Sequence, residues 1–203
     1  MGYLAGNANT TGNTNTFIGY HAGLSNTTGN SNIVLGYQAG LSSTTGSNNV
    51  FLGVHAGYFV TTGGNNLFLG RQAGRYIADG TTVLSNPANS LFLGYNTKAL
   101  ADGQTNQIVI GHDATGLGNN TTVLGNSSTT FTRLFGNVGI GTSTNAGYGL
   151  DVNGTGRFTG LTTFQAGTEH TTAGAGIILK TPDGTKRYKI TIDNSGNLIT
   201  TLQ

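Results

Sequence analysis

The sequence predicts an all-β protein whose main part is a parallel β-solenoid, and three observations support this fold class. An asparagine followed by an apolar triplet and a glycine returns every 17 residues over the first four repeats. The chain has 35 glycines and only 8% charged residues, unlike an ordinary globular domain. No charged residue occurs before position 71. A fixed short period in such a chain is typical of stacked coils that bury each other's faces.

The coils follow one another with few interruptions. Each repeat, or row, is counted from one closing glycine to the residue before the next. The first four closing glycines are 17 residues apart, the row of residues 70–93 is seven residues longer, and the row of residues 111–124 has only 14 residues. Insertions in a solenoid leave the stack as loops, so residues 82–88 are expected to project. Each glycine that closes a triplet is expected to supply a positive φ or a close backbone approach at a corner.

The apolar triplets are expected to be short strands, because they are rich in β-branched and aromatic residues and are bounded by Asn and Gly. Alternation along a strand turns its first and third residues to one side and its middle residue to the other. A coil of this size has one narrow interior, so one apolar face is left for another chain. We expect the first and third columns inside the coil and the middle column at the inter-chain interface. The middle column is Phe17, Val34, Phe51, Phe68, Phe92, Val109 and Val123.

The expected assembly is an intertwined homotrimer, because parallel chains arranged around an axis cover the remaining apolar face of every copy. The expected organisation is a shaft at residues 1–124, a neck at 125–147 and a C-terminal tip at 148–203. Residues 130–135 and 138–141 are expected to belong to the neck, and short strands are expected at 148–154 and 156–160 around an Asn-Gly turn. The tip is expected to end in a three-stranded meander over residues 176–180, 186–193 and 198–202.

Two resemblances follow from these patterns. The phrases closing at Gly19, Gly36, Gly53 and Gly70 resemble the left-handed β-roll heads of trimeric autotransporter adhesins of the YadA type, although most rows here are three residues longer. The segments Val138 to Gly141 and Leu150 to Gly154, followed by a short β tip, look more like bacteriophage tail-fibre proteins. These resemblances imply a trimeric fibre that attaches to a surface.

Several function classes find little support in the sequence. A net charge of +2 is too small for a nucleic-acid footprint, and the apolar runs of three to four residues are too short to insert in a membrane. The seven carboxylates show no pairing within one repeat column, and no nucleophile or phosphate-loop motif occurs. We therefore expect no enzymatic activity, no catalytic or metal-binding residues and no cofactor.

Two polar columns offer alternatives. His21 and His55 share a column with Gln38 and Gln72, which could form a metal ring on a three-fold axis, but a polar ladder on the coil surface is favoured. Pairs of threonines also stack between coils, which could build an ice-binding face. Adjacent threonines point to opposite sides, so hydrogen bonding at a corner is favoured for this column.

The predicted function is a structural fibre that displays its C-terminal tip for host or surface attachment, as a phage tail fibre located on the virion. A bacterial surface adhesin or extracellular filament subunit is the alternative, and a soluble ice-binding solenoid is a third. The expected partners are two further copies of the chain and a host surface glycan or protein. The candidate contacts form one basic cluster in the tip, Lys180, Lys186, Arg187 and Lys189.

Overall fold

The structure is a computed structural model that describes residues 2–142, 150–153, 177–180, 186–192 and 198–202. Its contacts divide the chain into two units, residues 1–133 and 134–203. All regular secondary structure among the described residues is β, and none of these residues forms a helix that could cross a membrane. The predicted all-β class is confirmed.

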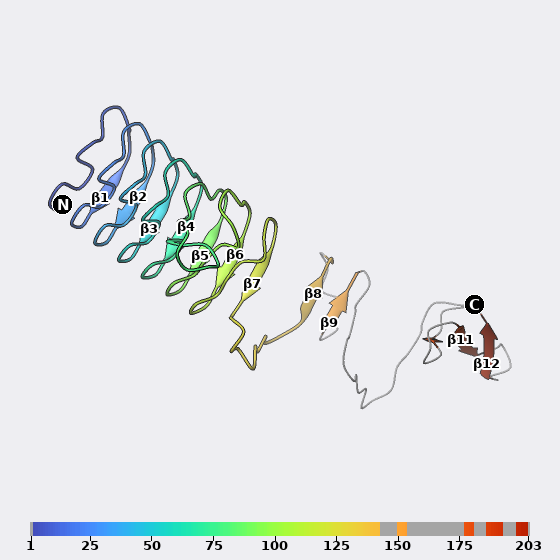
Figure 1. Cartoon of the computed structure of the whole chain (residues 1–203). Helices are drawn as coiled ribbons and strands as arrows, with labels where there is room; N and C mark the ends of the chain where they lie inside the picture. Colours follow the sequence, from blue (N-terminus) through green and yellow to red (C-terminus); the bar gives the residue numbers. More distant parts are fainter. Residues whose placement is uncertain (1, 143–149, 154–176, 181–185, 193–197, 203) are drawn as a thin grey trace. The chain divides into compact units, whose positions relative to one another are not determined.

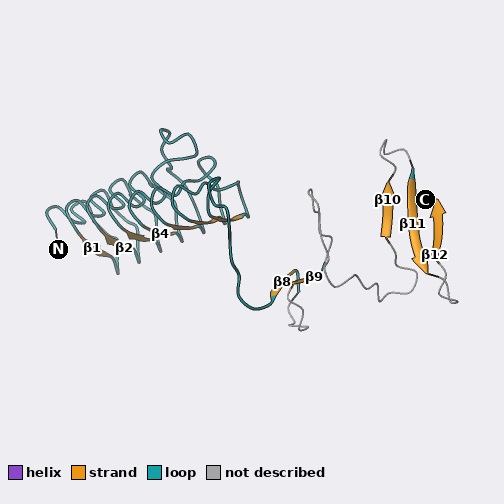
Figure 2. Ribbon diagram, turned by 90° about the horizontal axis from the view of Figure 1, so that it is seen from below, coloured by secondary structure: helices purple, strands orange, loops and turns teal. Residues whose placement is uncertain are grey.

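The first unit is a β-solenoid built on one parallel sheet of seven strands, seen as a row of parallel arrows in Figure 1. Every strand pairs with the next one in sequence, and every column stays in register across the 24-residue and 14-residue steps as well as the 17-residue ones. Figure 2 shows the strands gathered along one side of the coil. The strands are β1 (Thr16–Ile18), β2 (Ile33–Leu35), β3 (Val50–Leu52), β4 (Leu67–Leu69), β5 (Leu91–Leu93), β6 (Ile108–Ile110) and β7 (Thr122–Leu124).

The middle column of the strands lies inside the coil, so the predicted orientation was wrong. Phe51, Phe68, Phe92 and Val109 are fully buried within a single chain, and Val34 is 2% exposed. Phe17 packs against the same core from the first coil, and Val123 is half-buried in the last. These side chains cannot form an inter-chain interface, because their own coil already covers them. The reason is geometric: a three-residue strand presents one residue on one side and two on the other, and the narrow interior has room for one.

The core opposite this column is made of alanines. A file of small side chains lines the far wall, which leaves the width of an aromatic ring for the Phe column, and the Phe68 and Phe92 rings lie 4.7 Å apart and nearly parallel. Glycines that close the corner beside this file would place a Cβ against the rings, as at Gly23 and Phe17. The buried file contains Ala22, Ala39, Ala56, Ala73, Thr97 and Ala114.

The asparagine that opens each phrase forms a buried ladder along the shaft. The Oδ1 of Asn32 accepts the backbone N–H of Asn49 at 2.9 Å, and the Nδ2 of Asn49 donates to the carbonyl of Gly63 at 2.9 Å. Such bonds satisfy polar groups that would otherwise be buried at a cost of about 1–3 kcal/mol each. The ladder runs through Asn15, Asn32, Asn49, Asn66, Ser90 and Gln107.

The glycine that closes each triplet is required by close backbone approach, as predicted. Gly36 has a φ of 142°, and a Cβ at this position would lie 2.4 Å from the carbonyl oxygen of Gly53 one coil later. Gly53 and Gly70 repeat the same geometry. A side chain at this corner would clash with the next coil and strain its own backbone.

The insertion leaves the stack earlier than predicted. Tyr76 and Val83 form an antiparallel bridge at the base of a turn at Asp79, and Ile77 still packs against the core, so the projecting part is residues 78–82. Leu84 and Pro87 are already buried in the coil, and the carbonyl of Pro87 accepts the Nδ2 of Asn66 at 2.9 Å. The apolar Leu84 ends the loop because it fills the core position that Val60 holds one coil earlier.

The second unit contains a two-stranded parallel sheet of β8 (Val138–Ile140) and β9 (Leu150–Val152). The predicted strand at 148–154 therefore pairs back to β8, and its expected partner at 156–160 lies outside the described residues. The predicted C-terminal meander is confirmed. It consists of β10 (Ile177–Lys180), β11 (Arg187–Ile192) and β12 (Leu198–Leu202), each antiparallel to the next.

Candidate functional site

The main candidate site is the outer side of the seven-stranded sheet, which we call the strand face. It is built from the first and third columns of the strands, and its Leu and Ile side chains are unusually exposed, as at Ile33 (46%) and Leu35 (44%). Its first column is Thr16, Ile33, Val50, Leu67, Leu91, Ile108 and Thr122. Its third column is Ile18, Leu35, Leu52, Leu69, Leu93, Ile110 and Leu124. Apolar rows of this length are typical of surfaces that bind another molecule.

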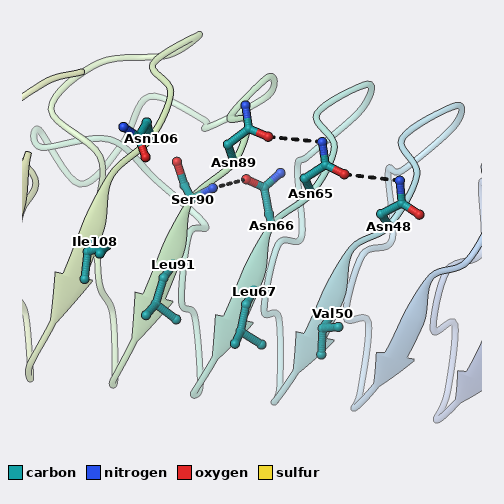
Figure 3. A pocket seen from close by; sticks show the side chains of 10 residues that line it. All are labelled: Asn48, Val50, Asn65, Asn66, Leu67, Asn89, Ser90, Leu91, Asn106 and Ile108. Carbon is teal, nitrogen blue, oxygen red and sulfur yellow. Dashed lines mark hydrogen bonds between the residues drawn. The ribbon is translucent and has the colours of Figure 1, made fainter. Parts of the chain in front are cut away.

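One edge of the strand face carries a second asparagine ladder, which we call the outer Asn column. Figure 3 shows Asn48, Asn65 and Asn89 joined side by side next to the first column of the strands. The Nδ2 of Asn48 donates to the Oδ1 of Asn65 at 3.1 Å, and the Nδ2 of Asn65 donates to the Oδ1 of Asn89 at 3.1 Å. All three have a φ between 51° and 59°, a conformation that Asn tolerates better than most residues. The full column is Thr14, Ser31, Asn48, Asn65, Asn89, Asn106 and Asn120.

The outer Asn column and the first column of the strands together line a shallow groove. It has a volume of about 550 Å³ and is bounded by four successive coils. Amide groups form one wall, as at Asn65 and Asn106, and aliphatic side chains form the other, as at Leu67 and Ile108 (Figure 3). The groove can therefore take a ligand that offers both apolar surface and hydrogen-bonding groups.

The opposite edge carries an exposed file that we call the tyrosine column. Each of its residues directly follows a glycine at the same corner of the coil. They are Tyr3, Tyr20, Tyr37, Val54, Arg71, Tyr95 and His112. The Tyr20 ring lies 5.5 Å from Tyr3 and 5.4 Å from Tyr37, with near-parallel planes. Further along, Arg71 lies over the Tyr95 ring and donates to its hydroxyl at 3.1 Å. These rings face one another along the shaft, so they offer their edges and hydroxyls to a partner.

Within the His column, one hydrogen bond links His55 to Gln38, while His21 stacks on the Tyr20 ring at 3.9 Å and its buried Nε2 has no hydrogen-bond partner among the described residues. The ring of His55 is held on both sides, with Nε2 3.1 Å from Gln38 Oε1 and Nδ1 3.2 Å from Arg75 Nη1. Partial burial lowers the pKa of His55, and the charges of Arg75 and Arg71 lower it further. A neutral ring that donates to Gln38 and accepts from Arg75 satisfies both contacts. Among the described residues, no three His, Asp or Glu side chains come together as a metal site would require.

Arg75 also stands among aromatic rings at the base of the projecting loop. Its guanidinium lies 5.0 Å from the Tyr58 ring, 5.7 Å from Phe59 and 4.9 Å from Tyr76. Cation–π contacts of this kind are worth about 0.5–2 kcal/mol each. They hold the base of the loop against the preceding coil.

The threonine column serves the coil corner. The hydroxyls of Thr10, Thr27 and Thr44 each donate to the carbonyl of the first threonine one coil later, at 2.9–3.2 Å. The second threonine of each pair is exposed, as at Thr28 and Thr45. Half of the column is thus used within the fold, in agreement with the favoured corner role.

The basic cluster of the tip is gathered on two paired strands. Lys180 ends β10 and lies directly opposite Arg187 at the start of β11, while Lys189 pairs with Ile178. Arg187 and Lys189 are two residues apart on β11. Lys186 lies just before β11 and is exposed. The pairing of β10 with β11 thus brings the backbone positions 180, 187 and 189 onto neighbouring strands, although they are spread over ten positions in sequence.

No known protein family, curated protein or solved structure matches this chain. The function of the protein is therefore inferred from the geometry of the strand face, its two edges and the C-terminal sheet. The sequence did not single out the tyrosine column or the outer Asn column. Both follow the same 17-residue period as the triplets, and aligning the rows on the closing glycine makes them visible.

Proposed function

We propose that the protein is a non-enzymatic fibre protein in which three parallel solenoids form a shaft that displays the C-terminal sheet. The observation that carries this proposal is the exposed strand face, a double file of side chains along all seven strands that is aliphatic except at Thr16 and Thr122. Leu69 and Leu124 are 40% and 50% exposed there, although the interior of the same coil is tightly filled. Removing such side chains from water is worth roughly 25 cal/mol per Å².

A further copy of the chain is the partner that fits this face. The rows of the solenoid repeat at the spacing of strands, about 4.8 Å, and a further copy of the chain offers the same repeat over the same length. Residues 1–70 carry no charge that would oppose close approach or protect a lone chain from association. The interface of the proposed trimer therefore consists of the first and third columns in place of the middle one.

The tip sheet is the proposed contact with a surface. Lys180 and Arg187 occupy paired positions of β10 and β11, and basic residues at neighbouring positions favour an anionic ligand. Three tips held together would raise the strength of weak binding by factors of roughly 10²–10⁴ without new contacts. This arrangement suits the distal part of a phage tail fibre that binds an anionic glycan or protein on its host.

A glycan array probed with the full chain tests the attachment role. We expect binding to acidic glycans that falls at least tenfold when Arg187 and Lys189 are both replaced by Gln. The double variant Arg133→Gln and Arg157→Gln removes two positive charges outside the strand face and the C-terminal sheet and is the matched control. Equal binding by both double variants, or no binding by the native chain to any glycan or host cell, would contradict the tip assignment.

A further inference from the structure

The two edges of the strand face differ in chemistry throughout the shaft. One edge is the outer Asn column, with amides or hydroxyls in all seven rows, and the other is the tyrosine column. The two edges are separated by the strand and a glycine, so Asn48 and Val54 lie six residues apart on either side of β3. The two edges of the strand face are therefore chemically different, so the face is asymmetric across the shaft as well as along it.

The outer Asn column has hydrogen-bonding capacity to spare. A side-chain amide has two N–H donors and two acceptor positions. The ladder uses one donor and one acceptor of Asn65, because it accepts from Asn48 and donates to Asn89. The other N–H and lone pair of this exposed amide are open to a partner, and the same holds in each row where the ladder continues.

The tyrosine column offers complementary groups. Tyr20 and Tyr37 are 42% and 47% exposed, and their hydroxyls form no hydrogen bond with the described residues of the chain. A tyrosine hydroxyl can donate and accept, and its ring adds apolar area, which is what the groove beside the outer Asn column can take. The rings turn their faces toward one another, which makes them poor platforms for a stacked sugar.

The area that a stable interface buries is also larger than the strand face without its two edge columns. The strand face alone is about 10 Å wide and roughly 30 Å long, from three residues across and seven rows along. Its footprint of about 300 Å² is below the roughly 800 Å² per partner that stable interfaces bury. Including both edge columns widens the face to about 20 Å and doubles the footprint to about 600 Å², which brings it close to that area.

Symmetry decides which edges meet. When parallel copies are arranged around an axis along the shaft, one edge of each face meets the opposite edge of the next copy. Antiparallel copies related by a two-fold axis would instead bring like edges together. We propose that, in the fibre, the tyrosine column of one chain packs into the groove beside the outer Asn column of the next, and that each groove is completed by the neighbouring copy.

Charge agrees with this pairing. The outer Asn column has no charged residue in any row, and Arg71 is the one Lys or Arg of the tyrosine column. Pairing unlike edges therefore never places two cations together, whatever the register. Tyr20 and Tyr37 then meet hydroxyl or amide groups in every register that keeps the rows aligned.

Disulfide trapping tests this pairing, and the chain offers a clean background because it has no cysteine. The first variant combines Ser31→Cys with Tyr37→Cys, and the second combines Asn48→Cys with Tyr37→Cys to cover an offset of one coil. Within one chain, residues 31 and 37 flank an extended strand and lie roughly 15–20 Å apart, whereas a disulfide needs Cα atoms within about 7 Å. Controls are the three single variants and Tyr37→Cys with Thr45→Cys, whose second site is exposed but lies off the strand face.

The proposal rests on the proposed fibre, so the reduced variants are also sedimented to measure the number of chains. We expect a three-chain mass throughout, and a covalent trimer as the major oxidised species in at least one mixed pair, with only background in the controls. A three-chain mass with no covalent trimer in either mixed pair, or with disulfides only in single variants, overturns the edge pairing and leaves the fibre intact. A one-chain mass overturns both.

Discussion

Asn49 and Asn66 are joined one coil apart by two hydrogen bonds to a single acceptor. The Oδ1 of Asn49 accepts the backbone N–H and the side-chain N–H of Asn66, each at 3.0 Å, and both residues are buried. This relationship recurs along the shaft and gives the repeated asparagine its structural meaning. The phrase begins with asparagine because its side chain can accept from the next coil and donate to it.

Replacing Asn49 by Ala is expected to destabilise the shaft by about 2–4 kcal/mol, because it leaves the Asn66 N–H and the Gly63 carbonyl without partners. Urea unfolding followed by β-sheet circular dichroism at a fixed chain concentration measures the change. Asn48→Gly is the control, since Asn48 is exposed, water can replace its contacts, and Gly tolerates the φ of 59° at this position. Equal effects of the two variants would contradict the role of the buried ladder.

Replacing Gly36 by Ala is expected to cost more than replacing Gly103 by Ala. Both have positive φ, 142° and 70°, but a Cβ at Gly36 would meet the Gly53 carbonyl at 2.4 Å, while one at Gly103 meets nothing within 4 Å. Backbone strain alone costs about 1–2 kcal/mol, and the clash adds to it only at Gly36. Melting temperatures of the two variants measure the difference, and similar values would show that the corner tolerates a side chain.

The Phe column and the strand face are expected to respond differently to truncation. Phe68→Ala should destabilise each chain by about 3–5 kcal/mol, because its ring is buried between Phe51 and Phe92. Leu67→Ala, one residue earlier on the exposed side, should leave single-chain folding nearly unchanged and weaken association. Unfolding and sedimentation across a range of concentrations separate the two effects. Concentration-independent unfolding of both variants would argue against the strand face as an interface.

This comparison also shows what the sequence could predict. The period, the seven triplets, the glycine corners and the C-terminal meander follow from local patterns, because Gly, Asn and β-branched residues have specific backbone requirements. The side on which the interior lies did not follow, because both faces of the triplets are apolar. The alanine file was the missing signal. A wall of Ala22 and Ala39 leaves room for one large side chain per coil and not for two.

The prediction that the middle column forms the inter-chain interface was wrong for the same reason. The argument that one apolar side of each strand is left uncovered still holds for the opposite side. A triplet with two apolar sides on a coil with one interior leaves one side uncovered, and that side is the first and third columns. The insertion boundary was misplaced because Leu84 and Pro87 look like loop residues in sequence but fill positions in the stack. Burial at these positions depends on coils that are distant in sequence.

Stability is expected to depend on pH through His55. Its pKa is lowered in the folded chain from an ordinary value of 6.5, so the unfolded chain binds the proton more readily. Stability should be fully present above about pH 6.5 and should fall as the pH drops below it. In the His55→Gln variant this part of the pH dependence should disappear, as measured by urea midpoints from pH 5 to 8. A native chain that gains stability on acidification over this range would contradict the contact with Arg75.

The native mass of the chain in solution tests the proposed fibre most directly. Sedimentation equilibrium is expected to give about three times the 20.8 kDa of one chain. A variant with Leu35→Asp and Leu69→Asp, which places charges on the strand face, is expected to dissociate while keeping its β-sheet signal. Thr28→Asp with Thr45→Asp, at exposed sites of the threonine column, should keep the three-chain mass. A native chain that sediments as a single compact copy would contradict the proposal.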